Sequence, residues 1–189
     1  MDCIVRVYIE CTIKDCRKKD FMIIRHAKYN EIDCIDEIYE NARNFMHSHG
    51  NPNQWVNGYP SKIDIENDMK LDKLYVLDHE GSIEGVFFLS DGIDPTYNYI
   101  ENGQWLNEEE YVVIHRIASA MKRRRIGDII IQDCQKRFDN IRIDNYYDNK
   151  PMQNMLMRNG FHHVGTIYLE DGNPRSAYHW CRHCNIGEN

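Results

Sequence analysis

The sequence of 189 residues has no apolar run long enough to span a membrane. A span needs about 18 or more consecutive apolar residues. The N-terminal run over residues 4–13 is interrupted by Arg6 and Glu10, which is unlike the apolar segment of a secretory leader. Internal repeats and low-complexity tracts are also absent, which excludes fibrous architectures. We therefore expect a soluble, cytoplasmic protein.

Positive charge is scarce as well. Lys and Arg number 23 against 30 Asp and Glu, which gives a formal net charge of -7. This balance disfavours wholesale binding to nucleic-acid backbones or anionic lipid. We expect neither a nucleic-acid nor a membrane partner, and any anion site must be local.

The cysteines form no disulfide framework. Their count is odd, and their positions are 3, 11, 16, 34, 134, 181 and 184. Scattered cysteines of this kind favour reduced thiols. Cys181-x-x-Cys184 lies beside His179 and His183, which is chemically capable of holding zinc, but structural zinc sites draw ligands from two separated pairs. We expect a thiol-rich tail and no metal, with a zinc site as the alternative.

Length and composition favour one compact domain, since 42% of the residues are hydrophobic and 28% are charged. Residues 22–180 carry the clear periodicity and form the expected domain. Residues 1–21 read as an N-terminal extension, either a loose strand or a tail, and residues 181–189 as a C-terminal tail.

Apolar periodicity predicts both helices and strands. The predicted helices cover residues 32–45, 61–71, 126–138 and 149–158, and the predicted strands cover residues 22–25, 73–78, 83–89, 111–120, 141–144, 161–169 and 175–180. Turns at Glu80-Gly81 and Asp171-Gly172 indicate antiparallel hairpins. The strand, helix and strand around residues 126–138 span about 35 residues, which implies a parallel pair with a right-handed crossover.

A basic cluster, Lys122 to Arg125, lies where a predicted strand leads into the helix that opens with Ile126-Gly127-Asp128. The first N–H groups of a helix have no intrahelical partner, and the helix dipole adds positive charge there. Arginines supply charge-assisted hydrogen bonds to phosphate, and Gly127 leaves the backbone open to a ligand. A solvated basic run is the alternative, but cations at a helix N-terminus cost about 0.3–1 kcal/mol each. The pattern predicts a pyrophosphate site.

The order of these motifs resembles the GNAT superfamily of N-acetyltransferases from residue 22 to about residue 180. The motifs are His115-Arg116-Ile117-Ala118, Arg123-Arg124-Arg125-Ile126-Gly127, Ile141-Arg142-Ile143-Asp144, Asn149 and Asn159-Gly160-Phe161. The resemblance implies an α/β (α+β) fold. Its sheet would be mixed, mostly antiparallel and twisted, with six to seven strands, one parallel pair and flanking helices.

The resemblance also implies acetyl-CoA as co-substrate. Backbone groups of His115, Arg116 and Ile117 would hold the acetyl carbonyl and the pantetheine arm, and Asn149 would meet that arm. The amides that would cradle the pyrophosphate are those of Arg123, Arg124, Arg125, Ile126, Gly127 and Asp128. Three positions depart from the family pattern: Arg125 replaces a turn glycine, Asp128 replaces a small residue, and Leu156 replaces the tyrosine that protonates the leaving thiolate.

His115 is the first candidate for general base, because imidazoles exchange protons near neutral pH. Strand alternation places Tyr111, Val113, His115 and Ile117 on one side unless a bulge interrupts it. Tyr111 and Glu110 are second candidates. A packed histidine bonded to a neighbouring carbonyl is the alternative for His115.

Two long loops carry rings that the resemblance assigns to the wall of an acceptor pocket. The rings are Trp55, Tyr59, Tyr97, Tyr99 and Trp105. Packing of these rings onto the core is the alternative. Acidic residues stand near them and would favour a cationic amine: Asp91, Asp94, Glu101, Glu108 and Glu109.

The leading hypothesis is an N-acetyltransferase that moves acetyl from acetyl-CoA to a primary amine of a small molecule or peptide. Transfer would be direct, in a ternary complex, by a monomer or homodimer. A non-catalytic acyl-CoA-binding protein is the alternative suggested by Leu156. A nucleic-acid module built on Lys122 to Arg125 is a weaker one, because four basic residues give a small footprint.

Overall fold

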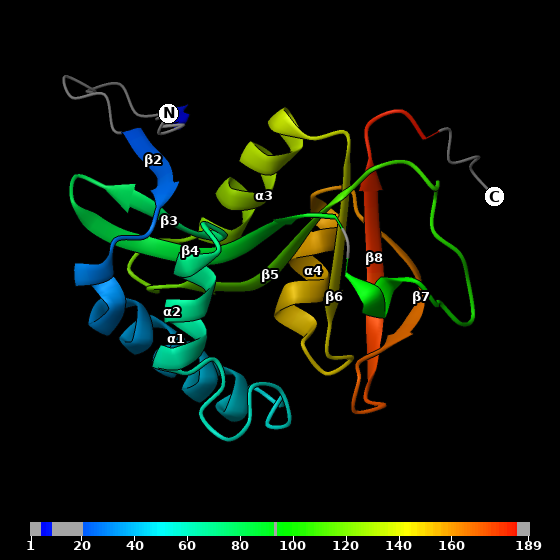
Figure 1. Ribbon diagram of the computed structural model, residues 1–189, viewed down its shortest axis with the longest axis horizontal. Coiled ribbons are helices and arrows are strands. Elements are labelled where there is room, and N and C mark those ends of the chain that lie inside the picture. The colour runs from blue at the N-terminus through cyan, green and yellow to red at the C-terminus, as the bar shows by residue number, and fades with distance from the viewer. Residues whose placement is uncertain (1–4, 9–20, 93, 185–189) are drawn as a thin grey trace.

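The computed structural model describes residues 5–8, 21–92 and 94–184. Its sheet has eight strands in the order β1-β2-β3-β4-β5-β6-β8-β7, running from β2 on the left of Figure 1 to β8 and β7 on the right. The strands are β1 (Val5–Tyr8), β2 (Phe21–His26), β3 (Leu74–His79), β4 (Ser82–Asp91), β5 (Val112–Ser119), β6 (Asn140–Asn145), β7 (His162–Tyr168) and β8 (Pro174–Cys181). The helices are α1 (Ile32–Ser48), α2 (Lys62–Lys70), α3 (Ile126–Arg137) and α4 (Lys150–Arg158), with the short 3-10 turns η1 (Tyr29–Glu31) and η2 (Pro95–Tyr97).

The predicted mixed sheet is confirmed. Strands β5 and β6 are parallel and are joined through α3, and the other neighbouring strands are antiparallel. Within the described residues, β2 to β8 give seven strands, which agrees with the six to seven expected of the domain, and the sheet has an eighth. The additional strand is β1, which pairs with β2 and lies in the segment for which the sequence left a strand or a tail open.

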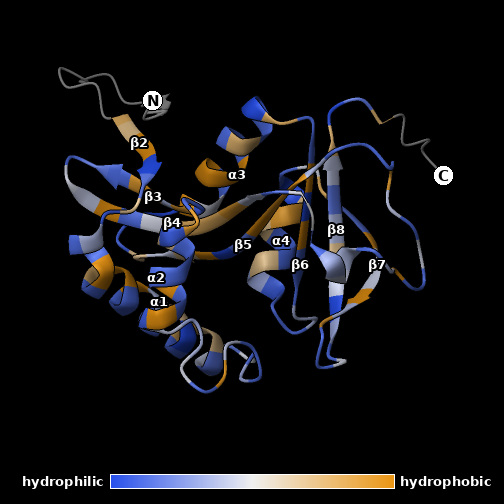
Figure 2. Cartoon of the chain, in the orientation of Figure 1, coloured by the Kyte–Doolittle hydropathy of each residue, from blue (hydrophilic) through white to orange (hydrophobic). Residues whose placement is uncertain are grey.

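The helices cover both faces of the sheet. Helices α3 and α4 pack in one apolar cluster with the inward residues of β4, β5 and β6, among them Ile114, Ile141 and Ile143. Helices α1 and α2 pack in a second cluster with β3 and β4. A third, smaller cluster holds Tyr97 and Trp105 against Val113. Figure 2 shows the apolar colour concentrated along the central strands, where these clusters meet.

Strands β5 and β6 part soon after they meet. Their register contains only Val112 opposite Ile141 and Val113 opposite Arg142, whereas β5 continues to Ser119 and β6 to Asn145. The parallel ladder therefore opens into a wedge in the middle of the sheet.

A bulge in β5 lies beside this wedge. His115 faces Phe88 and Ala118 faces Val86, so two residues of β5 oppose one of β4, and Arg116 has φ 51°. A bulge of this type reverses the alternation that follows it. Ile117 consequently packs against the α3 and α4 cluster, while His115 lies on the opposite face beside Tyr97. The sequence pattern placed these two side chains on one side unless a bulge interrupted the alternation, and this bulge separates them.

Candidate active site

A cavity of about 1020 Å³ opens at the wedge. Its walls come from the β5 bulge, the N-termini of α3 and α4, the loop between α1 and α2, and the hairpin between β7 and β8. Of the residues that the sequence suggested for donor binding, the following line it: His115, Arg116, Ile117, Arg123, Arg125, Ile126, Gly127, Asp128 and Asn149. Arg124 instead lines a smaller neighbouring pocket with Met22 and Gln132.

The N-terminus of α3 opens into the cavity without a cap. Arg125 precedes the helix in the left-handed conformation (φ 64°), and no side chain caps the helix. The first turn closes with the bond from Ile129 N to the Arg125 carbonyl. The amides of Ile126, Gly127 and Asp128 come before that bond and have no acceptor within the helix. This end of α3 suits an anion.

Asp128 does not block that end. Its side chain is 4% exposed and accepts hydrogen bonds from Arg158 (2.7 and 2.8 Å) and from Asn159 (2.8 Å). Burial opposes ionisation, but the bonds from Arg158 and Asn159 hold the pKa of Asp128 below its ordinary value. The negative charge of Asp128 is therefore matched within the protein.

Gly127 has a packing role. A Cβ at this position would overlap with Sδ of Met155 in α4. The missing side chain lets α3 and α4 approach each other, in addition to leaving the backbone open to the cavity.

Asn149 caps α4 and ties it to the opposite wall of the cavity. Its Oδ1 accepts from Met152 N (3.1 Å), and its Nδ2 donates to Gln54 Oε1 (2.8 Å). Gln54 also accepts from Asn51 Nδ2 at 2.7 Å. The loop between α1 and α2 is thus held against the N-terminus of α4.

His115 lies between two carboxylates. Its Nε2 is 3.1 Å from Asp94 Oδ2, and its Nδ1 is 3.5 Å from Asp144 Oδ1. The hydrogen bond with His115 and further bonds from Thr96 lower the pKa of Asp94 to about 2, although burial opposes this. An ionised Asp94 can only accept, so Nε2 of His115 carries the hydrogen in this bond. Nδ1 faces Asp144 at the longer contact.

The Asp144 oxygen that faces His115, Oδ1, also accepts a hydrogen bond from the Tyr97 hydroxyl at 2.8 Å. Burial, and then the charge of Asp144, raises the pKa of Tyr97, so the hydroxyl keeps its proton. Asp94, His115 and Asp144 all line the cavity.

Arg116 is a half-buried cation within the same wall. It donates to the Tyr59 hydroxyl at 2.7 Å, pairs with Asp68 of α2 at 2.7 Å, and lies 4.4 Å from the centre of the Phe88 ring. These contacts fix the side chain at the bulge and hold the Tyr59 loop against it.

The aromatic residues suggested for the acceptor pocket divide into three groups. Tyr99 stands alone: it is exposed, donates to Glu101 and does not line the cavity. Trp55 and Tyr59 line the cavity, and Trp55 also meets Tyr39 edge to face at 5.5 Å. Tyr97 and Trp105 are buried in the third cluster, where the Trp105 ring N–H donates to the Tyr97 carbonyl. Tyr111, the second candidate base, packs against that cluster and does not line the cavity.

The cavity also contains polar residues to which the sequence analysis assigned no role. Among them are Gln54, Asp144, Asn145, Arg158 and Arg175. Arg158 and Arg175 stand on a predicted helix and a predicted strand, whereas Gln54 lies in the loop between α1 and α2, and only the wedge brings these segments together. Residues at strand ends, such as Asp144 and Asn145, carried the one usable signal, since parallel strands often end at a site.

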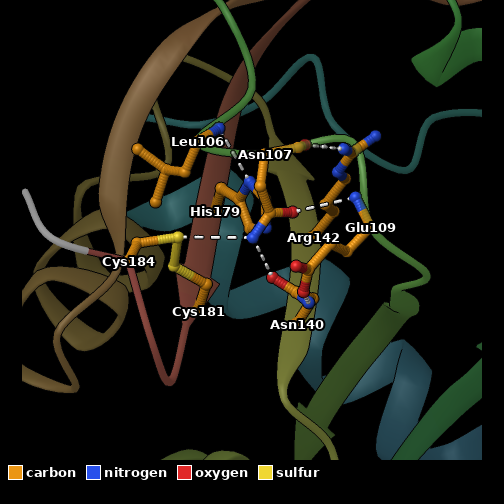
Figure 3. The surroundings of a disulfide bond; sticks show 8 residues. All are labelled: Leu106, Asn107, Glu109, Asn140, Arg142, His179, Cys181 and Cys184. Atoms are coloured by element: carbon orange, nitrogen blue, oxygen red, sulfur yellow. Dashed lines mark hydrogen bonds between the residues drawn. A yellow bond between two sulfur atoms is a disulfide. The ribbon is translucent and has the colours of Figure 1, made fainter.

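Cys181 and Cys184 form a disulfide at the end of β8 (Figure 3). The expectation of reduced thiols is wrong for this pair, because the turn after the strand brings the two Cα atoms to 5.7 Å. Asn107 Nδ2 donates to Cys184 Sγ at 3.3 Å, and the buried His179 accepts from Leu106 N at 3.1 Å. Cys3, Cys11 and Cys16 lie outside the described residues.

The described part of the chain contains no group of three or more His, Cys, Asp or Glu side chains placed to hold a metal ion. Within those same residues, no helix has the length and apolar character needed to cross a bilayer.

Several solved structures with this architecture are described as acetyltransferases. A GNAT-family acetyltransferase from Streptococcus agalactiae is 30% identical, with 86% of this chain and 96% of that chain covered and a TM-score of 0.79. A protein described as a putative acetyltransferase from Staphylococcus aureus is 25% identical, covering 84% and 97%, with a TM-score of 0.60. A GNAT-family acetyltransferase from Listeria monocytogenes, 18% identical over 87% and 96% with a TM-score of 0.64, shares the fold. Neither a family model nor a curated protein matches the sequence.

The strand order, the separation of β5 from β6 and the similarity to a solved GNAT-family acetyltransferase together identify the fold of an acetyltransferase. At this identity and coverage, the chain belongs to the GNAT family.

Proposed function

We propose that this protein transfers the acetyl group of acetyl-CoA directly to a primary amine of a small molecule or peptide, in a ternary complex. The observation that carries the proposal is the uncapped N-terminus of α3, which shares one cavity with His115 and its two carboxylates. Acetyl-CoA supplies an activated thioester when bound. The residues of this chain bind it, orient the acyl group and take the proton from the amine.

The donor side of the cavity fits a diphosphate. The amides of Ile126, Gly127 and Asp128 donate to phosphate oxygens, and Arg123 and Arg125 add charge-assisted hydrogen bonds. Arg158 neutralises Asp128, so the carboxylate does not repel the anion. Exposed backbone of the β5 bulge lines the wedge and orients the acyl group.

His115 acts as the general base on the acceptor side. Asp94 fixes the ring through Nε2, and Asp144 attracts the ammonium form of the amine to Nδ1. The proton passes from the ammonium to Nδ1, and the imidazolium that results lies between two carboxylates, which stabilise it. Trp55 and Tyr59 form the apolar wall beside this point.

The test is acetyl-CoA turnover with a panel of primary amines, followed by release of free thiol. His115→Ala should lower kcat by about 10²–10⁴-fold with unchanged CoA affinity, because a general base acts only on the transfer step. His47→Ala, on the exposed side of α1 and outside the cavity, is the matched control and should leave kcat unchanged. Equal kcat in wild type and His115→Ala would remove His115 from the mechanism.

A non-catalytic acyl-CoA-binding protein is the second candidate. Leu156, at the place of the family's thiolate-protonating tyrosine, is fully buried in the core and offers no proton. CoA binding without thiol release across the whole amine panel would favour this alternative.

A further inference from the structure

Arg175, near the start of β8, is a cation in the cavity that acetyl transfer as proposed above does not use. Its side chain is 14% exposed and lines the cavity. Nη1 donates to the carbonyl of Pro174 at 3.0 Å, whereas no hydrogen bond within the described residues engages Nη2. Removing a guanidinium from water is costly unless its donors find acceptors. A group that enters the cavity can supply the missing acceptor.

The alternation along β8 puts Arg175 on the acceptor side of the cavity. Ala177, two residues further on, packs in the third cluster with Tyr97. Side chains two residues apart on a strand share a face. Arg175 therefore lies on the same face as Asp144 and His115. Helix α3, whose N-terminus suits the diphosphate of the donor, packs on the opposite face.

Two neighbours fix the orientation of the guanidinium. Its carbon lies 4.4 Å from the centre of the Tyr146 ring, and its Nε lies 4.0 Å from Asp144 Oδ2. The ring covers one face of the guanidinium and leaves the edge open, where the N–H groups point outward in the plane of the group. At 4.0 Å, Asp144 attracts Arg175 without accepting a hydrogen bond from it. Nη2 thus keeps its donors for a ligand.

The other carboxylates on this side of the cavity have partners of their own. Asp94 is in contact with His115 Nε2 at 3.1 Å. Asp171, in the turn between β7 and β8, accepts hydrogen bonds from the backbone and the side chain of Asn173. Neither carboxylate forms a hydrogen bond or an ion pair with Arg175 among the described contacts. The positive charge of Arg175 is therefore available to an anion from outside.

We propose that Arg175 binds the carboxylate of the acceptor and that the acceptor is a free amino acid, an inference that rests on the function proposed above. Asp144 lies between Arg175 and His115, with Oδ2 toward the former and Oδ1 toward the latter. The ammonium of the amino acid would bind at Asp144 beside His115, and its carboxylate would accept from Nη2 of Arg175. The two opposite charges of the ligand then match those of the site.

Kinetics with matched pairs of acceptors test this role. Each pair is an amino acid and its primary amide, taken from the common protein amino acids together with β-alanine and γ-aminobutyrate, which place the carboxylate further from the amine. Arg175→Gln should lower kcat/KM for the amino acid about 10- to 100-fold through a raised KM, the loss expected for hydrogen bonds to a charged group. Its kcat/KM for the amide should equal that of wild type, because the amide has no carboxylate.

Two further variants serve as controls. Lys136→Gln removes one positive charge from the exposed side of α3, outside the cavity, and should match wild type with every acceptor. Arg175→Lys keeps the charge but loses the planar arrangement of donors, so it should recover part of the activity toward the amino acid. Turnover of the amide by Arg175→Gln reports that its fold and its general base are intact.

The outcomes separate this inference from the proposed function. Equal losses with amino acid and amide would make Arg175 a positioning residue for Asp144 and would overturn the inference, as would kinetics of Arg175→Gln equal to wild type. Wild type that acetylates amides or simple amines but no amino acid would also overturn it, and the proposed function would stand. Wild type that releases no thiol from acetyl-CoA with any amine would overturn both.

Discussion

At the scale of single residues, His179 shows how burial alone changes the chemistry of a side chain. The residue is fully buried in β8, its Nδ1 accepts from Leu106 N, and it meets Trp105 edge to face. Burial, assisted by the positive charge of Arg142, lowers the pKa of His179 from 6.5 to about 3. The sequence placed this histidine beside Cys181 and Cys184 as a possible metal ligand. In the structure it is a buried, neutral imidazole that accepts a backbone hydrogen bond.

This shift predicts a pH dependence of stability. The unfolded chain takes up a proton at His179 below pH 6.5, and the folded chain does so only near pH 3. Because the unfolded state then binds more protons, the stability contribution is present above pH 6.5 and is lost as the pH falls. At pH 5 the loss from this residue should be about 2 kcal/mol.

Urea denaturation at pH 7 and at pH 5 measures this loss. His179→Gln, which does not titrate, should show a drop in the free energy of unfolding about 2 kcal/mol smaller than wild type. Equal drops in both proteins would mean that His179 accepts a proton in the folded state.

At the scale of elements, local signals predicted most of the structure. Ser61 caps α2 and Asn149 caps α4, as their residue types indicate, and the turns at Glu80 and Asp171 join the two expected hairpins. The strand, helix and strand around α3 form the expected parallel pair.

The site depends on contacts that no local signal encodes. Asp94, His115 and Asp144 come from three segments and meet only because β5 lies between β4 and β6. The bulge at Arg116 leaves no mark in the apolar pattern, because it results from pairing with β4. The burial of Tyr97 likewise follows from its packing in the third cluster, against Val164 and Ile167 far along the chain.

The contact between α3 and α4 predicts how a substitution at Gly127 changes the stability of the protein. In an isolated helix, Gly→Ala stabilises by about 1 kcal/mol. At Gly127 we expect the opposite, a loss of about 1–3 kcal/mol, because the added Cβ overlaps with Met155 Sδ. Urea denaturation of wild type and Gly127→Ala measures whether the free energy of unfolding falls or rises.

A double-mutant cycle supplies the control. Met155→Ala removes the overlapping sulfur, so the double variant should be less destabilised than the sum of the two single changes. A Gly127→Ala protein more stable than wild type would show that α4 moves aside without cost.

At the scale of the whole molecule, the sheet consists of two blocks joined at the wedge. Strands β1 to β5 form one antiparallel block, and β6, β8 and β7 form the other. The ladder between β5 and β6 contains two residue pairs, against six between β6 and β8. The apolar cluster that contains α3 and α4 joins the two blocks. The cavity lies between the blocks where β5 and β6 have separated.

A ligand that contacts both blocks should therefore stabilise the entire fold. By the proposed function, CoA would bind Arg125 at the start of α3 and Asn149 after β6, across the wedge. At a CoA concentration about 100 times Kd, the free energy of unfolding should rise by about 2.7 kcal/mol. For a domain of this size, Tm should rise by about 5–10 °C.

Charge provides the control for this last prediction. The protein carries a net charge of -7, so binding of an anionic ligand depends on the local arginines at α3. Arg125, whose side chain is 69% exposed, should contribute to CoA affinity without contributing to the core. Arg125→Ala should keep the Tm of the ligand-free protein but show a smaller rise with the same CoA concentration, and added salt should reduce the wild-type rise further. An equal rise in wild type and variant, insensitive to salt, would mean that the ligand's phosphates do not bind at the start of α3.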